Sequence, residues 1–284
     1  MISASNKAFR LAALSPSGPS SPSPMMLSHG VSDMIQNLLL LGGTVEASAL
    51  ARQLSEAGVQ AVMSFAGRVE ALKPQPLATR VGGFGGACGL AVYIRENGIT
   101  HVIDATHPFA AQMSHNAIAA CSKTRTPLIA LTRAPWMPTE KDRWTRAADI
   151  SDAAERLAGA PKRVFLAVGR MHLNEFIHHP QHFYLLRLVD QPTEALAFPD
   201  YHAIIARGPF SYDDDLALLR QYGIDLVVSK NAGGGGSRSK IDAARDLGIE
   251  VLMIDRPDIP PRHEVHSADE VMRWLKDHPT DLGV

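Results

Sequence analysis

Short apolar runs alternate with longer amphipathic stretches from residue 35 to the end of the chain. Such runs are typical of strands buried on both faces, and stretches with helical period are typical of the helices that connect parallel strands. The pattern therefore predicts an α/β fold with parallel sheets. In the first half we expect helices near 46–56, 89–96 and 110–123, and strands near 37–41, 59–65, 78–81, 101–105 and 128–132.

The same alternation resumes after a turn-rich stretch at 133–139. Its prolines, Pro135 and Pro138, remove backbone donors and disfavour helix in the preceding residue, so the stretch is a candidate hinge. We therefore predict two domains, residues 34–136 and residues 137–284. In the second we expect helices near 152–157, 213–221, 239–247 and 268–276, and strands near 163–167, 184–188, 203–206, 225–229 and 251–254.

Residues 1–33 differ from the rest of the chain because they are rich in serine and proline. Such a composition cannot bury enough apolar surface to offset the entropy lost on ordering. We expect a disordered extension, with Met34 as a candidate natural start. The apolar patch at 11–14 is too short for a secretory signal, whereas a mitochondrial-type transit peptide remains an alternative.

The composition is that of an ordinary globular protein, with 45% hydrophobic and 20% charged residues and a formal net charge of −1. A near-neutral chain without a run of lysine or arginine is a poor partner for nucleic acid. No apolar run approaches the ~20 residues of a membrane-spanning helix, so we expect no membrane association. Cys88 and Cys121 lack the spacing of metal ligands, which predicts no metal site and fits a reducing cytoplasm.

The first predicted strand runs directly into Gly42, Gly43 and Thr44 and then into a helix. Helix N-termini bind phosphate through unpaired N–H groups, and glycines let a pyrophosphate approach the backbone. The loop is therefore a candidate dinucleotide site, although the full G-x-G-x-x-G pattern is absent. Glu46 in the first helical turn would compete with a bound anion unless it points away. The alternative is a tight turn in which Thr44 caps the helix.

The second predicted strand is followed within a few residues by Arg68. Near this point dinucleotide-binding folds place an acid for a free ribose hydroxyl, or a base for a ribose 2′-phosphate. Arg68 therefore favours NADPH over NADH. The alternative is that Arg68 is one solvated surface charge among many.

Two further loops follow the third and fourth predicted strands. The first contains Gly83 and Phe84, and the second contains Asp104, Thr106 and His107. Open α/β folds bind ligands at the carboxyl edge of their strands, so we expect both loops to line a ligand. His107 titrates near neutrality and is a candidate proton donor. The alternatives are a flexible loop with Phe84 packed in the core, and Thr106 as the cap of the next helix.

A second glycine loop follows a strand in the second half and contains Lys230, Asn231, Gly233 and Gly234. A compact cation beside an amide suits an anionic or polar ligand. Arg207 follows another strand and is expected at the same sheet edge. Further cations at predicted strand ends are Arg133, Arg170, Arg187 and Arg238. Each alone is more often a surface charge, but their shared placement suggests a polycarboxylate substrate.

Several motifs in register resemble the precorrin-6A reductase family over about residues 35–257. These are Leu41-Gly-Gly-Thr-Val-Glu-Ala47, Ala66-Gly-Arg68, Val81-Gly-Gly-Phe-Gly-Gly86, Asp104-Ala-Thr-His-Pro-Phe-Ala110, Arg207-Gly-Pro-Phe210 and Ser229-Lys-Asn-Ala-Gly-Gly234. The resemblance implies two Rossmann-like parallel-sheet domains with the cofactor cleft between them. It also implies NADPH-dependent reduction of the C18–C19 double bond of precorrin-6A, or of its cobalt form, to precorrin-6B in cobalamin biosynthesis.

The resemblance further implies roles for individual residues. Asp104 and His107 become candidates for catalysis, and Arg207 and Lys230 for substrate binding. The implied cofactor residues are Gly42, Gly43, Thr44, Arg68, Gly83, Phe84, Thr106, Lys230, Asn231, Gly233 and Gly234. The implied partner is a tetrapyrrole substrate, with other corrin-pathway enzymes as further candidates. The alternatives are an NADP-dependent oxidoreductase of another small polar substrate and a nucleotide-binding sensor without catalysis.

Overall fold

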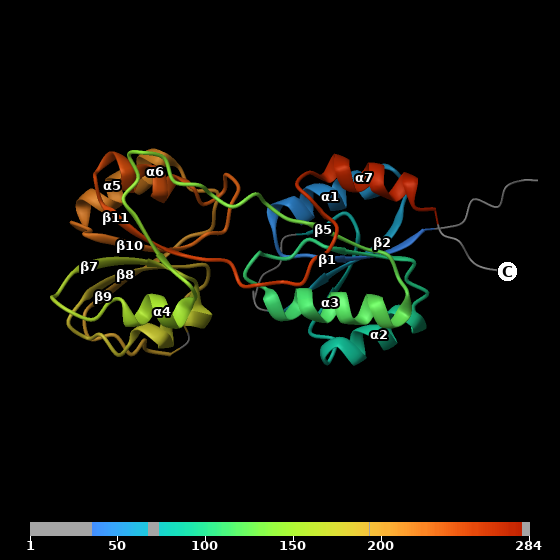
Figure 1. Ribbon diagram of the computed structural model, residues 1–284, viewed down its shortest axis with the longest axis horizontal. Coiled ribbons are helices and arrows are strands. Elements are labelled where there is room, and N and C mark those ends of the chain that lie inside the picture. The colour runs from blue at the N-terminus through green and yellow to red at the C-terminus, as the bar shows by residue number, and fades with distance from the viewer. Residues whose placement is uncertain (1–35, 68–73, 193, 280–284) are drawn as a thin grey trace, which may run out of the picture. The chain divides into compact units, whose positions relative to one another are not determined.

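A computed structural model describes residues 36–67, 74–192 and 194–279 of the chain. The predicted extension at 1–33 and Arg68 lie outside these ranges. Within them the chain forms two six-stranded sheets in which all paired strands are parallel (Figure 1). This arrangement confirms the expected fold class of two Rossmann-like parallel-sheet domains. No helix in the described ranges is long and apolar enough to cross a membrane.

The first sheet has the strand order β12-β5-β4-β1-β2-β3. Its strands are β1 (Asn37–Leu41), β2 (Gln60–Phe65), β3 (Ala78–Val81), β4 (His101–Asp104), β5 (Leu128–Leu131) and β12 (Glu264–Val265). Because β1 lies between β2 and β4, the connections on its two sides run in opposite directions across the sheet. The carboxyl ends of β1 and β4 therefore form a topological switch point, where open α/β sheets bind ligands.

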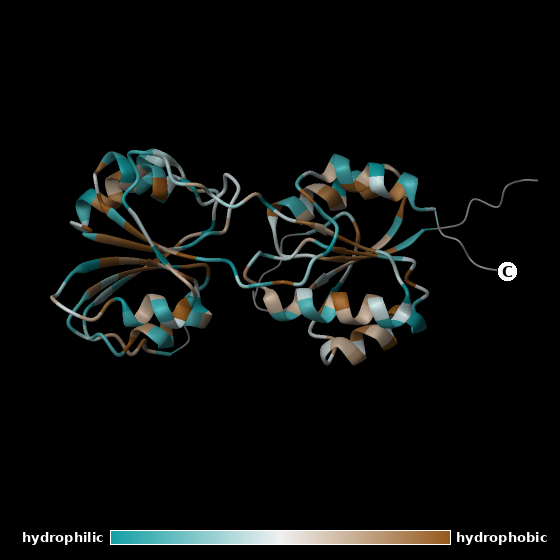
Figure 2. Ribbon diagram, in the orientation of Figure 1, coloured by the Kyte–Doolittle hydropathy of each residue, from teal (hydrophilic) through white to brown (hydrophobic). Residues whose placement is uncertain are grey.

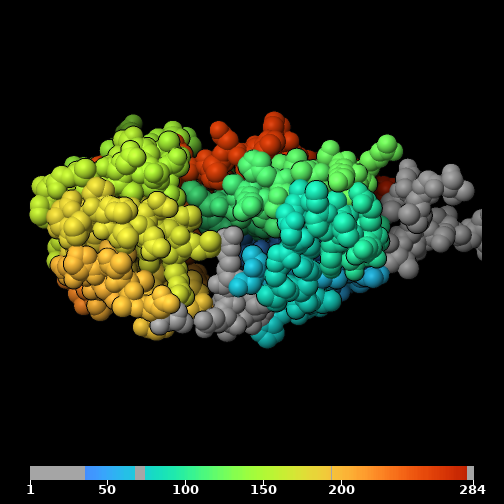
Figure 3. All heavy atoms as spheres, turned by 90° about the horizontal axis from the view of Figure 1, so that it is seen from below, coloured from blue at the N-terminus to red at the C-terminus, as the bar shows by residue number. Residues whose placement is uncertain are grey.

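Helices cover both faces of the first sheet. One face carries α1 (Val45–Glu56) and α7 (Ala268–Asp277), and the other carries α2 (Gly86–Glu96) and α3 (Ala111–Thr124) (Figure 1). Leu40 of β1 packs in the α1 and α7 layer, and its neighbour Leu39 packs in the α2 and α3 layer. Burial on both faces explains why β1 is an unbroken apolar run. Helices α2 and α3 pack together and form the cyan to green surface of Figure 3.

The second sheet has the order β6-β11-β10-β7-β8-β9, so its switch point lies between β7 and β10. Its strands are β6 (Trp144–Ala147), β7 (Arg163–Ala167), β8 (Phe183–Leu188), β9 (Tyr201–Ile205), β10 (Leu226–Lys230) and β11 (Glu250–Ile254). Helices α5 (Tyr212–Gln221) and α6 (Ser239–Asp246) cover one face, and α4 (Ile150–Glu155) and the 3₁₀ segment η1 (Arg170–Phe176) cover the other. Figure 2 shows the apolar strands at the centre of each sheet and polar residues on the outer helix surfaces.

The structure contains each strand and helix that the hydrophobic pattern predicts, with small shifts at their ends. The pattern does not predict β6, β12 or η1. The expected second domain, residues 137–284, also includes residues 264–277, which the structure adds to the first sheet. There β12 pairs with β5, and α7 packs its buried side chains Val271 and Trp274 in the same apolar cluster as β1. The last helix is therefore correctly predicted, but it packs against the first sheet and not against the second.

The return of the chain creates two crossovers between the sheets. The first crossover, residues 132–143, joins β5 to β6, and the second crossover, residues 255–263, joins β11 to β12. The turn-rich stretch predicted as a hinge lies within the first crossover. Both crossovers contact the loops beside the switch points. Arg133 of the first crossover pairs with Glu46 after β1, and Arg256 of the second donates a hydrogen bond to the Asn231 carbonyl after β10.

Candidate active site

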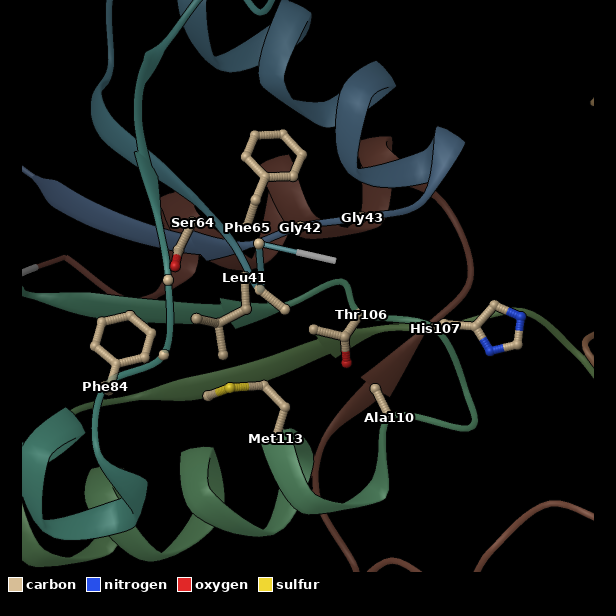
Figure 4. A pocket seen from close by; sticks show the side chains of 14 residues that line it. Leu41, Gly42, Gly43, Ser64, Phe65, Phe84, Thr106, His107, Ala110 and Met113 are labelled. Carbon is tan, nitrogen blue, oxygen red and sulfur yellow. The ribbon is translucent and has the colours of Figure 1, made fainter. Parts of the chain in front are cut away.

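A pocket, here called the first pocket, lies at the switch point of the first sheet (Figure 4). Six of the predicted site residues line it, namely Gly42, Gly43, Gly83, Phe84, Thr106 and His107. The other lining residues are Leu41, Ser64, Phe65, Ala66, Gly67, Gly82, Ala110 and Met113. Figure 4 shows Phe84 and His107 at opposite ends of this pocket. A lining of apolar side chains and glycine backbone with few polar groups suits an extended ligand that carries flat rings.

The turn between β1 and α1 leaves its backbone open to the first pocket. Gly43 has φ +123°, in the region that favours glycine, and a Cβ built there would meet no atom within 4 Å. Next to it, the Thr44 hydroxyl accepts a hydrogen bond from the Ala47 N–H (3.1 Å) and donates one to the Ala105 carbonyl (2.9 Å). Thr44 is therefore the N-cap of α1, as in the alternative interpretation, and it ties the turn to the end of β4.

The carboxylate of Glu46 is directed away from the start of α1. It forms an ion pair with Arg133 of the first crossover, with 2.6 Å between Arg133 Nη2 and Glu46 Oε2. The pairing leaves the helix N-terminus without a competing free acid. It also commits Arg133, one of the cations predicted to face substrate, to a contact within the protein.

Arg80 shapes the wall of the first pocket and is absent from the predicted site. Its guanidinium lies 3.8 Å from the Phe84 ring centroid and donates hydrogen bonds to the Gly82 carbonyl (3.0 Å) and the Gly83 carbonyl (3.2 Å). It also donates to the Ser64 hydroxyl of β2 (2.8 Å). These contacts hold the glycine-rich loop against the sheet, so Phe84 is a fixed wall of the pocket. The position of Arg80 at the end of a short strand is the only sequence signal for this role.

Asp104 is a buried residue whose carboxylate is hydrogen-bonded within the protein. Its side chain is 1% exposed and accepts hydrogen bonds from the Thr106 N–H (3.1 Å) and the Thr106 hydroxyl (2.7 Å). It also accepts from the Ser114 hydroxyl (2.6 Å) and the Arg262 guanidinium. These four bonds use the acceptor capacity of the carboxylate, so nothing in its surroundings favours a catalytic role, which stays a prediction. Helix α3 begins only at Ala111 and its N-cap is Ala110, so Thr106 is not the cap that the alternative interpretation expects.

His107 is held as a neutral ring. The Phe109 N–H donates a hydrogen bond to Nδ1 (3.1 Å), so the proton of the neutral imidazole is on Nε2. Burial, followed by the nearby charges of Arg133, Lys230 and Arg256, lowers the pKa of His107 to about 4. The ring can therefore donate a hydrogen bond near neutral pH, but it carries no imidazolium proton. This state argues against His107 as the proton donor that the sequence suggests.

A second pocket lies at the switch point of the second sheet, at the carboxyl ends of β7 and β10. It shares His107 and Ala110 with the first pocket, so the two pockets adjoin. Its basic lining residues are His107, Arg170, His172, Lys230 and Lys240. The other lining residues are Phe109, Ala110, Ala167, Val168, Gly169, Met171, Val189, Ser229, Ala232 and Ser237. The second pocket is thus more basic than the first.

The remainder of the second glycine loop binds the first crossover. The Asn231 side chain accepts a hydrogen bond from the Trp136 N–H (2.7 Å) and donates one to the Trp136 carbonyl (3.0 Å). A Cβ at Gly233 would lie 2.3 Å from the Ala134 carbonyl oxygen, and one at Gly234 would also collide with the crossover. The cofactor contacts expected of Asn231, Gly233 and Gly234 stay a prediction. A glycine is needed at 233 because the backbone of the crossover approaches closely, whereas at 234 the close neighbour is the Arg133 side chain.

Most of the other predicted cations are paired within the protein. Arg187 forms a buried ion pair with Asp215, and Arg238 pairs with Asp242 of the same helix. Arg207 pairs with Asp190 (2.8 Å) and is not among the lining residues of either pocket. Its role in substrate binding stays a prediction. Of the arginines predicted to face substrate, Arg170 lines the second pocket.

The fold and the two pockets define the class of protein. Two parallel sheets share the same order in five of their six strands, β5-β4-β1-β2-β3 and β11-β10-β7-β8-β9. Each sheet has a pocket at its switch point, and the pockets adjoin at His107 and Ala110. This is the architecture of α/β enzymes in which a nucleotide cofactor meets a second ligand. Because fold alone does not fix the reaction, similarity to known proteins decides the family.

The profile of the precorrin-6x reductase family, CbiJ/CobK, matches residues 37–276. The precorrin-6A reductase of Rhodobacter capsulatus is 54% identical over 248 residues, which cover 87% of this chain and 99% of that protein. The cobalt-precorrin-6A reductase of Priestia megaterium is 33% identical over 249 residues, with 84% and 97% covered. A solved structure of CobK precorrin-6A reductase matches with a TM-score of 0.83 at 54% identity and covers 88% of this chain and 100% of that chain. The chain therefore belongs to the precorrin-6A reductase family and is an oxidoreductase of cobalamin biosynthesis, not a sensor.

Proposed function

We propose that this enzyme uses NADPH to reduce the C18–C19 double bond of precorrin-6A and releases precorrin-6B. The observation that carries the proposal is the junction of the two pockets at His107 and Ala110. A nicotinamide in the first pocket and an anionic macrocycle in the second would meet at this junction. The names of the relatives supply the identity of the macrocycle, which is a tetrapyrrole with carboxylate arms.

The residues of the first pocket fit a dinucleotide. The open backbone at Gly43 would admit the pyrophosphate beside the start of α1, where a side chain would occupy the space, and Gly42 would line the same turn. Gly83 and Phe84 would line the cofactor, and Thr106 would lie near the nicotinamide. When bound, NADPH supplies the hydride. The chain itself orients the two reactants and excludes water from the apolar part of the pocket.

His107 is proposed to orient a reactant at the junction through its Nε2–H. Its Nδ1 is occupied by the Phe109 N–H, so Nε2 is the atom that donates. The proton that accompanies the hydride then comes from solvent or from a substrate carboxylic acid, because the His107 ring is neutral.

The substrate is proposed to be the cobalt-free macrocycle. The relatives named precorrin-6A reductase from Rhodobacter capsulatus and Sinorhizobium are 54% and 47% identical to this chain. The relatives named cobalt-precorrin-6A reductase from Priestia megaterium and Salmonella typhimurium are 33% and 30% identical. The greater similarity to the first group favours precorrin-6A over its cobalt form.

The decisive experiment mixes the full chain with NADPH and precorrin-6A under anaerobic conditions. We expect NADPH oxidation that matches product formation mole for mole, and a product two mass units heavier, as two-electron reduction requires. NADPH deuterated at C4 should transfer one deuterium to the macrocycle. Cobalt-precorrin-6A is run in parallel as the competing substrate. Absence of NADPH oxidation with both macrocycles would overturn the proposed function, and faster turnover of the cobalt form would overturn the choice of substrate.

The pH dependence of the reaction tests the neutral state of His107. With its pKa lowered to about 4, the ring does not change charge between pH 5.5 and 8 as an ordinary histidine would. We expect His107→Phe to lower kcat about 10- to 100-fold, the scale of a lost hydrogen-bond donor, without changing the shape of kcat/KM over that range. His107→Gln keeps an N–H donor and should retain more activity. An acid limb with a pKa near 6.5 that disappears in His107→Phe would show that the imidazolium is used.

Cofactor choice is proposed to depend on Arg68, which lies outside the described residues. Charge-assisted hydrogen bonds to a 2′-phosphate are worth about 1.5–3 kcal/mol, so Arg68→Ala should raise the apparent constant for NADPH roughly 10- to 100-fold. The constant for NADH should barely change. Titration of both cofactors against the wild-type and Arg68→Ala proteins measures the difference. An equal loss with both cofactors would assign Arg68 to loop support or to substrate binding.

The enzyme is proposed to work in a reducing cytoplasm. Cys88 and Cys121 are both free thiols, and no disulfide joins cysteines in the described part of the chain. The enzymes that make precorrin-6A and consume precorrin-6B are its proposed pathway partners, since they share its substrate or product.

A further inference from the structure

Lys240 is a buried charge in the second pocket that the motifs do not single out. It lies in the first turn of α6, is 5% exposed and lines the pocket beside Ser237. Its Nζ donates a hydrogen bond to the Ser237 carbonyl oxygen (2.6 Å) and lies 5.2 Å from the Trp136 ring centroid. The ammonium therefore has a backbone dipole and an aromatic face as neighbours.

No carboxylate of the described residues forms an ion pair with this ammonium. Asp215, whose charge acts on Lys240, is fully buried and already accepts bonds from the Arg187 guanidinium and the Ser239 hydroxyl. Burial of an ammonium without a paired anion is costly. A carboxylate that entered the pocket and reached Nζ would remove much of that cost.

The groups around Lys240 are mostly basic. Burial, opposed by the charge of Asp215 and reinforced by that of Arg187, lowers the pKa of Lys240 to about 8. Arg170 and Lys230 line the same pocket as further cations, and His172 lies there too, whereas His107 is neutral. The pocket therefore favours anions, and its least exposed cation changes charge between pH 7 and pH 9.

We propose that Lys240 binds one carboxylate arm of the tetrapyrrole substrate in the second pocket. The carboxylate would pair with Nζ, while the Ser237 carbonyl keeps the ammonium in place. The identity of the ligand rests on the proposed function, whereas the anion site itself rests on the geometry of the second pocket. Because the bound anion stabilises the ammonium, binding above pH 8 takes up a proton.

Kinetics of Lys240→Gln test the contact at pH 7. Loss of a buried charge pair with a ligand should raise the KM for precorrin-6A about 30-fold or more, with kcat within about threefold of wild type. The KM for NADPH should not change. Lys276→Gln, which removes an exposed lysine of α7, is the matched control and should leave all three constants unaltered.

The pH profile separates this role from a structural one. In the wild type, kcat/KM for precorrin-6A should fall about 5-fold between pH 8 and pH 9 as Lys240 loses its proton. In Lys240→Arg the guanidinium stays charged, so that fall should disappear even if the absolute value is lower. A fall in Lys240→Arg equal to that of wild type would overturn the proposal.

Binding of uroporphyrin III, a tetrapyrrole with eight carboxylates, gives a readout that needs no turnover. Its fluorescence titration should show weaker binding to Lys240→Gln than to wild type at pH 7, and a smaller difference at pH 9. If wild type binds uroporphyrin III in this way but does not reduce precorrin-6A, the proposed function fails and the anion site stands. If wild type reduces precorrin-6A and Lys240→Gln lowers only kcat, or alters neither kinetics nor binding, the anion site is wrong.

Discussion

We expect Arg262→Ala to lower the free energy of unfolding by about 3–5 kcal/mol, the usual cost of leaving a buried charge without its partner. Arg262 is 8% exposed and its guanidinium contacts Asp104, which is 1% exposed at the end of β4. Removal of Arg262 leaves Asp104 buried with only the Thr106 and Ser114 donors. A loss of 1 kcal/mol lowers the melting temperature of a chain of this size by about 2–4 °C, so the melting temperature of Arg262→Ala should be roughly 6–20 °C lower.

An exposed ion pair supplies the control for this effect. Arg156 pairs with Asp152 one helical turn away, and the Arg156 side chain is 50% exposed. Arg156→Ala should therefore leave the melting temperature close to that of wild type, because solvent screens an exposed pair. In the double variant Arg262→Met, Asp104→Leu, apolar side chains replace both charges, so part of the lost stability should return. Equal melting temperatures for Arg262→Ala and Arg156→Ala would show that the Asp104 contact is not a buried pair in solution.

The hydrophobic periodicity of the chain predicts the strands because the burial pattern of each strand is contained in its own short segment. Leu38–Leu41 are buried on alternate faces, so β1 has no polar position and reads as a strand under helices. The same logic places the first pocket, since the order of strands and helices puts Gly43 and Thr106 at one sheet edge. Each of these features follows from a pattern contained within a short segment, combined with the order of the segments along the chain.

The features that the sequence does not predict depend on residues far apart in the chain. Strand β12 has two residues and no apolar run, and it is a strand only because β5 offers it a backbone edge. The contact of the Asp104 carboxylate with Arg262, 158 positions away, is equally invisible in the sequence around either residue. Lys240 lies in a polar stretch typical of an exposed helix, and its burial depends on packing against Trp136.

The lowered pKa of His107 also depends on residues far apart in the chain. Its position at a strand end predicts a pocket residue, and it does line both pockets. Its lowered pKa reflects burial and the charges of Arg133, Lys230 and Arg256, which come from three separate segments. Position in a motif can therefore indicate a site, whereas the protonation state of a residue there needs the tertiary structure.

The two crossovers meet at Arg256, and this junction explains the second glycine loop. Arg256 donates hydrogen bonds to the Asn231 carbonyl (2.9 Å), the Arg133 carbonyl (2.7 Å) and the Ala232 carbonyl (3.2 Å). One guanidinium thus joins the second crossover to the first crossover and to the loop that follows β10. The loop must lie flat against both segments, which a side chain at its centre would prevent.

We therefore expect Gly233→Ala to destabilise the protein by about 2–5 kcal/mol, the sum of backbone strain and overpacking. Gly233 has φ +70°, and a Cβ there would lie 2.3 Å from the Ala134 carbonyl oxygen and 2.5 Å from Arg256 Nη2. Because the oxygen belongs to the backbone, the crossover must shift to relieve the contact. The shift should also displace Lys230 at the second pocket and raise the KM for precorrin-6A.

Gly235→Ala, two residues along the same loop, is the matched control. A Cβ at Gly235 would meet no atom within 4 Å, and its φ lies outside the positive region. Gly235→Ala should therefore leave the urea midpoint and the KM for precorrin-6A close to those of wild type, since alanine there adds neither strain nor a clash. Urea unfolding of the three proteins, followed by steady-state kinetics, measures both effects. If Gly233→Ala and Gly235→Ala behaved alike, the glycine at 233 would serve only flexibility, and the close approach of crossover and loop would not persist in solution.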